Sequence, residues 1–248
     1  MIVFAIARNE LRRLYLSPLA WIIMALIQFL LAIVFFTLLN NYLQLDSRKD
    51  ILGITNTVVA GTLQNAGLLV LLAAPILTMR LFSEERRSGT MTLLLSAPVT
   101  VTQLVLGKYL GMLAFMFLLL VLITLMPVSL YLGTSIDPGQ LACGQLGLLL
   151  LMCSITAAGL FMSTLSRQPA VAAAGTFATV FLLWIIHIAG ATGNEHVTAV
   201  FSYLSLLRHF NSLLSGMFSS VDVIYYILMS TVFILLGIWR LDALRTDS

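Results

Sequence analysis

A charged cluster lies within residues 82–90, where Glu84, Glu85, Arg86 and Arg87 follow one another. Guanidinium groups bind carboxylates and phosphates through paired, charge-assisted hydrogen bonds. Carboxylates close to a helix start are favoured by the helix dipole. The cluster therefore suits either an acidic or phosphate-bearing partner or contact with lipid headgroups at a membrane surface. Its spacing alone does not decide between these two interpretations.

No other segment offers a catalytic, metal or nucleotide site. The pair Gly107 and Lys108 lacks the upstream glycine of a phosphate-binding loop, and no serine or threonine follows it. The histidines His187, His196 and His209 do not fall at metal-ligand spacing with carboxylates or thiols. We therefore expect no cofactor and no enzyme activity in this chain.

A membrane enzyme is the alternative that would need a buried catalytic pair. Ser154 and His187 are the available partners, but the G-x-S-x-G turn of a serine nucleophile is absent. Cys143 and Cys153 lie ten residues apart, or about 15 Å along a helix, which is too far for a disulfide. Neither pair supports a reaction.

The composition defines what must position the charged cluster. Of 248 residues, 60% are hydrophobic and only 9% are charged. In a soluble domain about a quarter of the residues are charged. The apolar residues form runs of about twenty, the length that crosses a bilayer as a helix. The net charge is +3, and the positive residues lie in short loops beside these runs. They do not alternate with aromatic residues as in a protein that binds single-stranded nucleic acid. The sequence thus predicts an all-α polytopic membrane protein that binds the lipid bilayer and no nucleic acid.

Six transmembrane helices are expected in a single domain over residues 1–248. Pro75 and Pro127 lie inside two of these spans and are expected to kink them, which membrane helices tolerate. The predicted spans are 19–39, 57–81, 105–132, 141–165, 169–190 and 222–240.

Residues 2–17 are predicted to form an amphipathic helix at the membrane interface. Phe4, Ala7, Leu11 and Leu14 share one face at helical spacing. The opposite face carries the cations Arg8, Arg12 and Arg13. Ser17 and Pro18 then turn the chain into the first span.

The distribution of Lys and Arg predicts that both termini lie in the cytoplasm, because cytoplasmic loops are enriched in these residues. In that orientation only Arg48, Lys49 and Arg208 lie outside. The cytoplasmic side then holds Arg8, Arg12, Arg13, Arg80, Arg86, Arg87, Lys108, Arg167, Arg240 and Arg245.

Two segments between spans have their own predicted structure. Residues 84–97 are expected to form a short cytoplasmic helix closed by Pro98, after which Thr100 and Gln103 form a capping box for the next helix. Residues 191–221 are long and semi-polar, and they are expected to form short helices at the outer membrane surface, where they would act as a gate.

The run from Phe82 to Thr90, followed by Ser96-Ala97-Pro98-Val99 and Leu106-Gly107-Lys108, resembles the signature of ABC-2-type transporter permeases. The similarity is closest to the gliding-motility-type branch, which carries a pattern like Arg208-His209-Phe210 and Asp222-Val223-Ile224-Tyr225-Tyr226 before its last span. It extends over the whole chain and implies the ABC-2, type V exporter-like permease fold, with an N-terminal elbow helix and six spans.

The resemblance also implies a function. Such permeases couple ATP hydrolysis by a separate ABC ATPase, which binds ATP and Mg, to export across the bacterial inner membrane. Two permease copies, or two related permeases, would form the working unit, and an extracytoplasmic auxiliary subunit is a further candidate partner. The implied ATPase contacts are Glu84, Glu85, Arg86, Arg87, Ser88, Gly89 and Thr90, with support from Arg8, Arg12 and Arg13 on the N-terminal helix.

Two questions stay open at this stage. An ATP-driven anchor for a periplasmic or motility-type machine would need the same coupling helix as a transporter. Polar residues within the spans either line a substrate route or bond helix to helix, and we favour the second interpretation. These residues are Gln28, Gln64, Asn65, Gln145 and Thr156.

Overall fold

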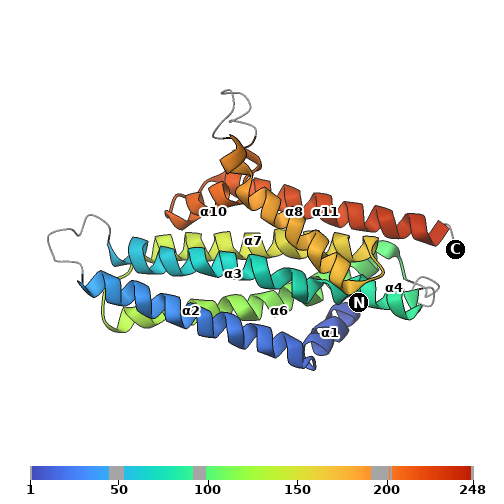
Figure 1. The fold of residues 1–248 in the computed structure, drawn as a ribbon, viewed down its shortest axis with the longest axis horizontal. Helices are drawn as coiled ribbons and strands as arrows, with labels where there is room; N and C mark the ends of the chain where they lie inside the picture. Colours follow the sequence, from blue (N-terminus) through green and yellow to red (C-terminus); the bar gives the residue numbers. More distant parts are fainter. Residues whose placement is uncertain (1, 45–52, 92–98, 191–200, 202, 247–248) are drawn as a thin grey trace.

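The computed structural model describes residues 2–44, 53–91, 99–190, 201 and 203–246, all of which are helical or lie in turns and links between helices (Figure 1). The helices are α1 (Ile2–Tyr15), α2 (Pro18–Gln44), the π-helix η1 (Thr55–Val59), α3 (Ala60–Thr78), α4 (Arg80–Ser88), α6 (Val101–Ser129), the 3₁₀-helix η2 (Leu130–Leu132), α7 (Pro138–Leu165), α8 (Pro169–Gly190), α10 (Leu206–Leu214) and α11 (Ser220–Thr246).

Six helical segments in the described part of the chain are long and apolar enough to cross a membrane, which confirms the predicted fold class. Their bounds are Pro18–Gln44, Thr55–Ser88, Val101–Leu132, Pro138–Leu165, Pro169–Ile186 and Ser220–Arg245. The second segment has 34 residues and would be about 51 Å long as an α-helix, whereas the hydrocarbon core is about 30 Å thick. The polar helix α4, at the end of this segment, therefore projects beyond the membrane-spanning part.

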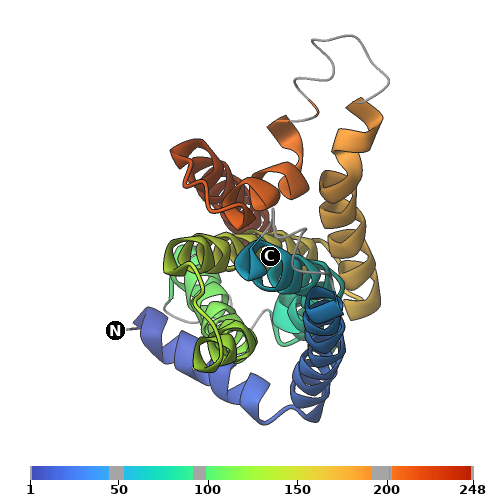
Figure 2. The same ribbon diagram turned by 90° about the vertical axis from the view of Figure 1, so that its left-hand side faces the viewer.

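Helix α7 lies at the centre of the fold and packs against α3, α6, α8, α10 and α11 (Figures 1 and 2). Its contact with α3 is very close at Gly159, where an added Cβ atom would overlap the Thr78 hydroxyl oxygen and lie 2.6 Å from Thr78 Cβ. Since lipid offers no hydrophobic drive for helix association, close packing through small residues stabilises such contacts.

Gly159→Ala is therefore expected to lower the free energy of unfolding by about 1–3 kcal/mol through overpacking. The measurement is the thermal midpoint of the purified chain in detergent. Gly133→Ala is the matched control, because a Cβ there meets no atom within 4 Å. Equal midpoints for the two variants would contradict the close α3–α7 contact.

One end of the bundle gathers the termini, α1, α4, the start of α6 and the end of α7 (Figure 1). We call this the charged end, because all ten cations that were predicted to share one side belong to these elements, to the link that follows α7, or to the last turns of α11. Arg208 lies on α10, which contacts the start of α7 toward the other end through a hydrogen bond from the Gln140 amide to the Leu214 carbonyl. Arg48 and Lys49 lie outside the described residues.

Helix α1 packs across α6 with almost no space between the two backbones. Cβ atoms on Gly107 and Gly111 would lie 2.7 Å from Ile6 Cβ and 2.7 Å from the Ala7 carbonyl oxygen, respectively. Leu11 and Leu14 of the predicted apolar face are partly buried and pack against the core, and Glu10 is buried beside them, whereas Phe4 is 75% exposed. Arg8, Arg12 and Arg13 are exposed, as an amphipathic helix requires.

The helix that carries the charged cluster has different bounds from those predicted. It begins at Arg80, directly after α3, because Met79 both ends α3 and starts α4 in helical conformation. It ends at Ser88, because Gly89 adopts the left-handed conformation with φ of 73°. Residues 92–98, and with them the last six residues of the predicted segment 84–97, lie outside the described residues. The capping box of Thr100 and Gln103 is confirmed.

Candidate functional site

A buried lysine organises the charged end. Lys108 on α6 is only 3% exposed. Its ammonium group lies 2.6 Å from Glu85 Oε1 and 3.4 Å from Glu10 Oε2, and it donates to the Leu81 carbonyl oxygen at 2.6 Å. The same group lies 5.0 Å from the centre of the Phe82 ring. A buried ammonium group is tolerated only when carboxylates and hydrogen-bond acceptors compensate its charge, as they do here.

The two carboxylates that hold Lys108 extend the contact into an ion-pair network. Glu10 comes from α1 and Glu85 from α4, and burial raises the pKa of Glu85 while the attraction of Lys108 opposes that rise. Arg13 lies 3.8 Å from Glu85 and donates to Glu84 at 2.7 Å. This network joins α1, α4 and α6 at the charged end of the bundle. It comprises Glu10, Arg13, Glu84, Glu85 and Lys108.

Arg86 ties α4 to a third neighbour. Its guanidinium donates to the Thr164 carbonyl oxygen at the end of α7. Burial, together with the nearby cations Arg167 and Arg240, lowers the pKa of Arg86. Arg86 thus points toward the bundle and contacts α7 rather than open space.

The residues at the tip of α4 point outward. Arg87, Ser88, Gly89 and Thr90 are exposed, and the hydroxyls of Ser88 and Thr90 lie 2.8 Å apart. The predicted coupling residues therefore have three different environments. Glu84 and Glu85 belong to the network, Arg86 contacts α7, and the residues at the tip are exposed.

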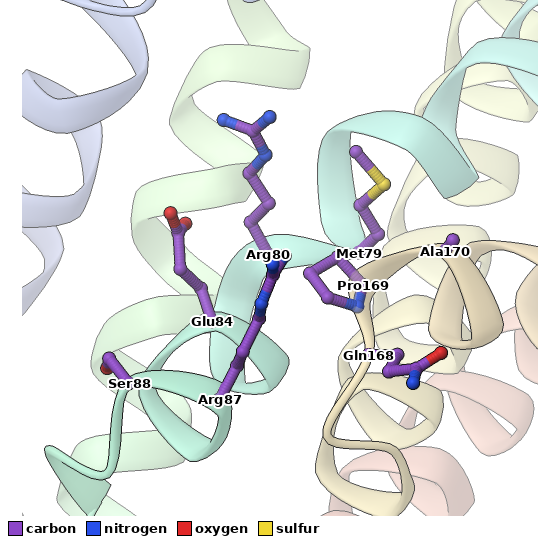
Figure 3. Close-up of a pocket in the computed structure, with 8 residues that line it drawn as sticks. All are labelled: Met79, Arg80, Glu84, Arg87, Ser88, Gln168, Pro169 and Ala170. Carbon is purple, nitrogen blue, oxygen red and sulfur yellow. The ribbon is translucent and has the colours of Figure 1, made fainter.

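A cavity of about 760 Å³ opens between α4 and the start of α8 (Figure 3). Its lining combines charged, polar and apolar side chains from both helices and from the residue that precedes each of them. They are Met79, Arg80, Glu84, Arg87, Ser88, Gln168, Pro169 and Ala170.

A second polar cluster fastens α10 to α11. His209 Nδ1 lies 2.6 Å from Asp222 Oδ1, and Nε2 lies 2.8 Å from the Tyr203 carbonyl oxygen. The imidazole stacks on the Tyr225 ring with centres 4.1 Å apart. Tyr226 donates to the Leu206 carbonyl oxygen at 2.9 Å. The sequence motif before the last span is therefore a packed contact between two helices.

The polar residues within the spans have mixed roles. Gln28 on α2 donates to the Leu122 carbonyl oxygen on α6 at 3.1 Å, which is the helix-to-helix bond that we favoured for this group. Asn65 donates to its own helix at Gly61. The amide of Gln145 and the hydroxyl of Thr156 are buried without a hydrogen-bond partner in the described part of the chain. These two side chains leave the question of a substrate route open.

The membrane-enzyme alternative, which would need Ser154 and His187 to act together, has no support at Ser154. Ser154 Oγ donates to the Leu151 carbonyl oxygen of its own helix at 2.9 Å. The side chain of His187 lies outside the described residues.

The fold and the charged end define a class: a polytopic, all-helical membrane protein with polar helices fixed to one end of its spans. Comparison with protein-family models shows more, because the model described as ABC-2 family transporter protein matches residues 4–243. The chain therefore belongs to this family and is the membrane permease component of an ABC transporter. No curated protein matches the sequence.

Membership also assigns the chemistry to another subunit. Permeases of this family lack ATPase activity themselves, typically carry no cofactor, and work with an ABC ATPase. In the described residues no group of three or more His, Cys, Asp or Glu side chains could hold a metal.

Proposed function

We propose that this permease receives the conformational change of the ATPase at the exposed tip of α4, mainly at Ser88, Gly89 and Thr90, and passes it to the spans through the ion-pair network. The observation that carries this proposal is the connection of one short helix to four others. Helix α4 continues from α3, pairs with α1 and α6 through Glu84 and Glu85, and bonds to α7 through Arg86.

The contacts of α4 determine which helices move when the ATPase subunits close. A displacement of α4 cannot be absorbed locally, because Lys108 would lose its partners inside a poorly solvated site. The displacement is transferred instead to α3, α6 and α7, which tilt together. Two prolines, Pro75 in α3 and Pro127 in α6, are the positions at which these helices flex.

In this proposal the charged end faces the cytoplasm of a bacterium, so that both termini lie inside and the chain resides in the inner membrane. The positive-inside rule supports this orientation, since ten Lys and Arg residues belong to this end. The first helix, with Arg8, Arg12 and Arg13, supports the ATPase interface beside α4.

We also propose how the transporter assembles and to which branch of the family this permease belongs. Two permease copies, or two related permeases, form the working unit with two ATPases, and 191–221 acts as the outer gate. The pattern of Arg208, His209 and Phe210 followed by Asp222 supports the gliding-motility-type branch. Helix α10, which lies in the described part of that segment, is fastened to α11 through His209 and Asp222.

The test is Thr90→Arg at the tip of α4. We expect co-purification with the ABC ATPase encoded nearest the gene, and stimulation of that ATPase, to fall about tenfold, which corresponds to about 1.4 kcal/mol of binding free energy. Thr90 is exposed, so the permease itself should fold normally.

The matched control is Thr134→Arg, which makes the same change at an exposed position at the other end of the bundle. It should leave both readouts unchanged. Normal ATPase binding by the Thr90 variant would exclude the tip as the docking point.

A further inference from the structure

We propose that the cavity between α4 and the start of α8 binds the phosphate-bearing headgroup of an anionic phospholipid. Arg80 and Arg87 both line this cavity, and Figure 3 shows Arg87 extending along α4 toward the backbone of Arg80, whose own guanidinium points away from Arg87. This ligand goes beyond the coupling function, and the proposal does not depend on it.

The charge balance of the cavity favours an anion. Arg80 and Arg87 have no carboxylate within 4.0 Å among the residues that the structure describes. The carboxylate between them, Glu84, is already paired with Arg13. Among the described residues, the cavity therefore presents two guanidinium groups without a carboxylate partner, and a phosphate from outside the chain, which accepts paired hydrogen bonds, would suit them.

Neighbouring groups increase the positive potential. The pKa of Arg86 is lowered by burial and by Arg167 and Arg240, so both of these cations act on Arg86. Arg86 and Arg167 directly precede the lining residues Arg87 and Gln168 in the chain. Arg240 Nε is buried without a hydrogen-bond partner in the described part of the chain. The first turn of α8 contains no acidic residue, so its positive dipole end is not compensated there.

The position of the cavity favours a lipid over a soluble anion. Its lining includes the last residue before α4, Met79, and the first two residues of α8, Pro169 and Ala170. These are the positions at which two apolar spans meet the headgroup region. Ile76 and Val171, which continue into the spans from the cavity, are 40% and 55% exposed. A headgroup in the cavity would thus leave its acyl chains against apolar side chains.

The experiment measures binding of phosphatidylglycerol and phosphatidylcholine to the purified full-length chain in detergent by native mass spectrometry. We expect the wild type to prefer phosphatidylglycerol and the double variant Arg80→Gln/Arg87→Gln to lose about tenfold or more of that affinity. Ala170→Trp, which occupies part of the cavity without changing the charge, should also weaken binding. Arg8→Gln/Arg12→Gln is the matched control, since it removes the same charge from exposed positions on α1 and should bind as the wild type does.

Three outcomes would overturn the proposal. Equal losses in both double variants would mean that surface charge alone attracts the lipid. Displacement of phosphatidylglycerol by inorganic phosphate at equal concentration would indicate a simple anion site. Unchanged lipid preference, combined with lost co-purification of the ATPase, would assign Arg80 and Arg87 to the protein partner. None of these outcomes alters the test at Thr90.

Discussion

Lys108→Met is expected to lower the free energy of unfolding by about 3–5 kcal/mol, because breaking a buried ion pair leaves the remaining charges without compensation. The side chain of Lys108 is 4% exposed and that of Glu10 is 8% exposed. Methionine fills a similar volume, so the loss would come from the charge rather than from a void. The measurement is the thermal midpoint of the purified permease, together with its monodisperse yield.

A second set of variants separates charge from packing. Glu10→Gln/Glu85→Gln in the Lys108→Met background removes the orphaned carboxylates and should recover a large part of the loss, because a neutral set of similar shape does not pay the cost of buried charge. Arg12→Met is the surface control, since Arg12 is exposed and its replacement should change stability by no more than about 0.5 kcal/mol. A Lys108→Met variant that melts with the wild type would show that the network is not needed for the fold.

Lys108→Met also tests the coupling between the ATPase and the spans. Lys108 holds Glu85 of α4 against α6, so a surviving Lys108→Met protein should bind the ATPase at Thr90 but respond to it less. Binding with reduced stimulation would support transmission through the network, whereas loss of both would indicate a general folding defect.

The spans were predictable from the sequence because their signal is local. A run of about twenty apolar residues has few alternatives to a membrane helix, and Thr100 with Gln103 specifies its own cap. The prolines at positions 75 and 127 lie inside helices, as expected. The bounds of α4 were missed because the charged run was treated as the start of a new segment, whereas the helix continues through Met79 and ends where Gly89 adopts positive φ.

The partners of the charged cluster were not predictable in the same way. Glu10 and Lys108 are 98 residues apart, and no local spacing relates them. Two signals existed, however. Glu10 lies beside Ala7 and Leu11 of the face predicted to be apolar, and Gly107 and Gly111 flank Lys108 at the spacing that lets another helix approach. Together they indicate a helix packed over a lysine that needs a carboxylate.

The contact between His209 and Asp222 illustrates the same limit, since the motif was recognised but its geometry was not. The Tyr203 carbonyl can only accept a hydrogen bond, so the Nε2 atom of His209 must carry a hydrogen. The short contact at Nδ1 then requires a second hydrogen, which either His209 or Asp222 supplies. The pair therefore holds one proton more than a neutral imidazole beside a carboxylate.

This proton count predicts an asymmetry between the two partners. His209→Ala is expected to cost about 3–5 kcal/mol, because Asp222 is only 6% exposed and its Oδ2 atom already lacks a partner in the described part of the chain. Asp222→Asn should cost no more than about 1.5 kcal/mol, because its amide N–H donates to Nδ1 while Nε2 still donates to Tyr203. Thermal midpoints of the two variants in detergent measure the difference.

The double variant His209→Ala/Asp222→Ala separates the cost of an unpaired buried carboxylate from the cost of a void. It removes the buried carboxylate along with its partner, so it should be more stable than His209→Ala alone, even though it leaves a larger void. Limited proteolysis, which acts on locally opened segments, should then cleave near α10 most readily in His209→Ala. If Asp222→Asn destabilises as strongly as His209→Ala, the pair does not share a proton in the way that its hydrogen bonds indicate.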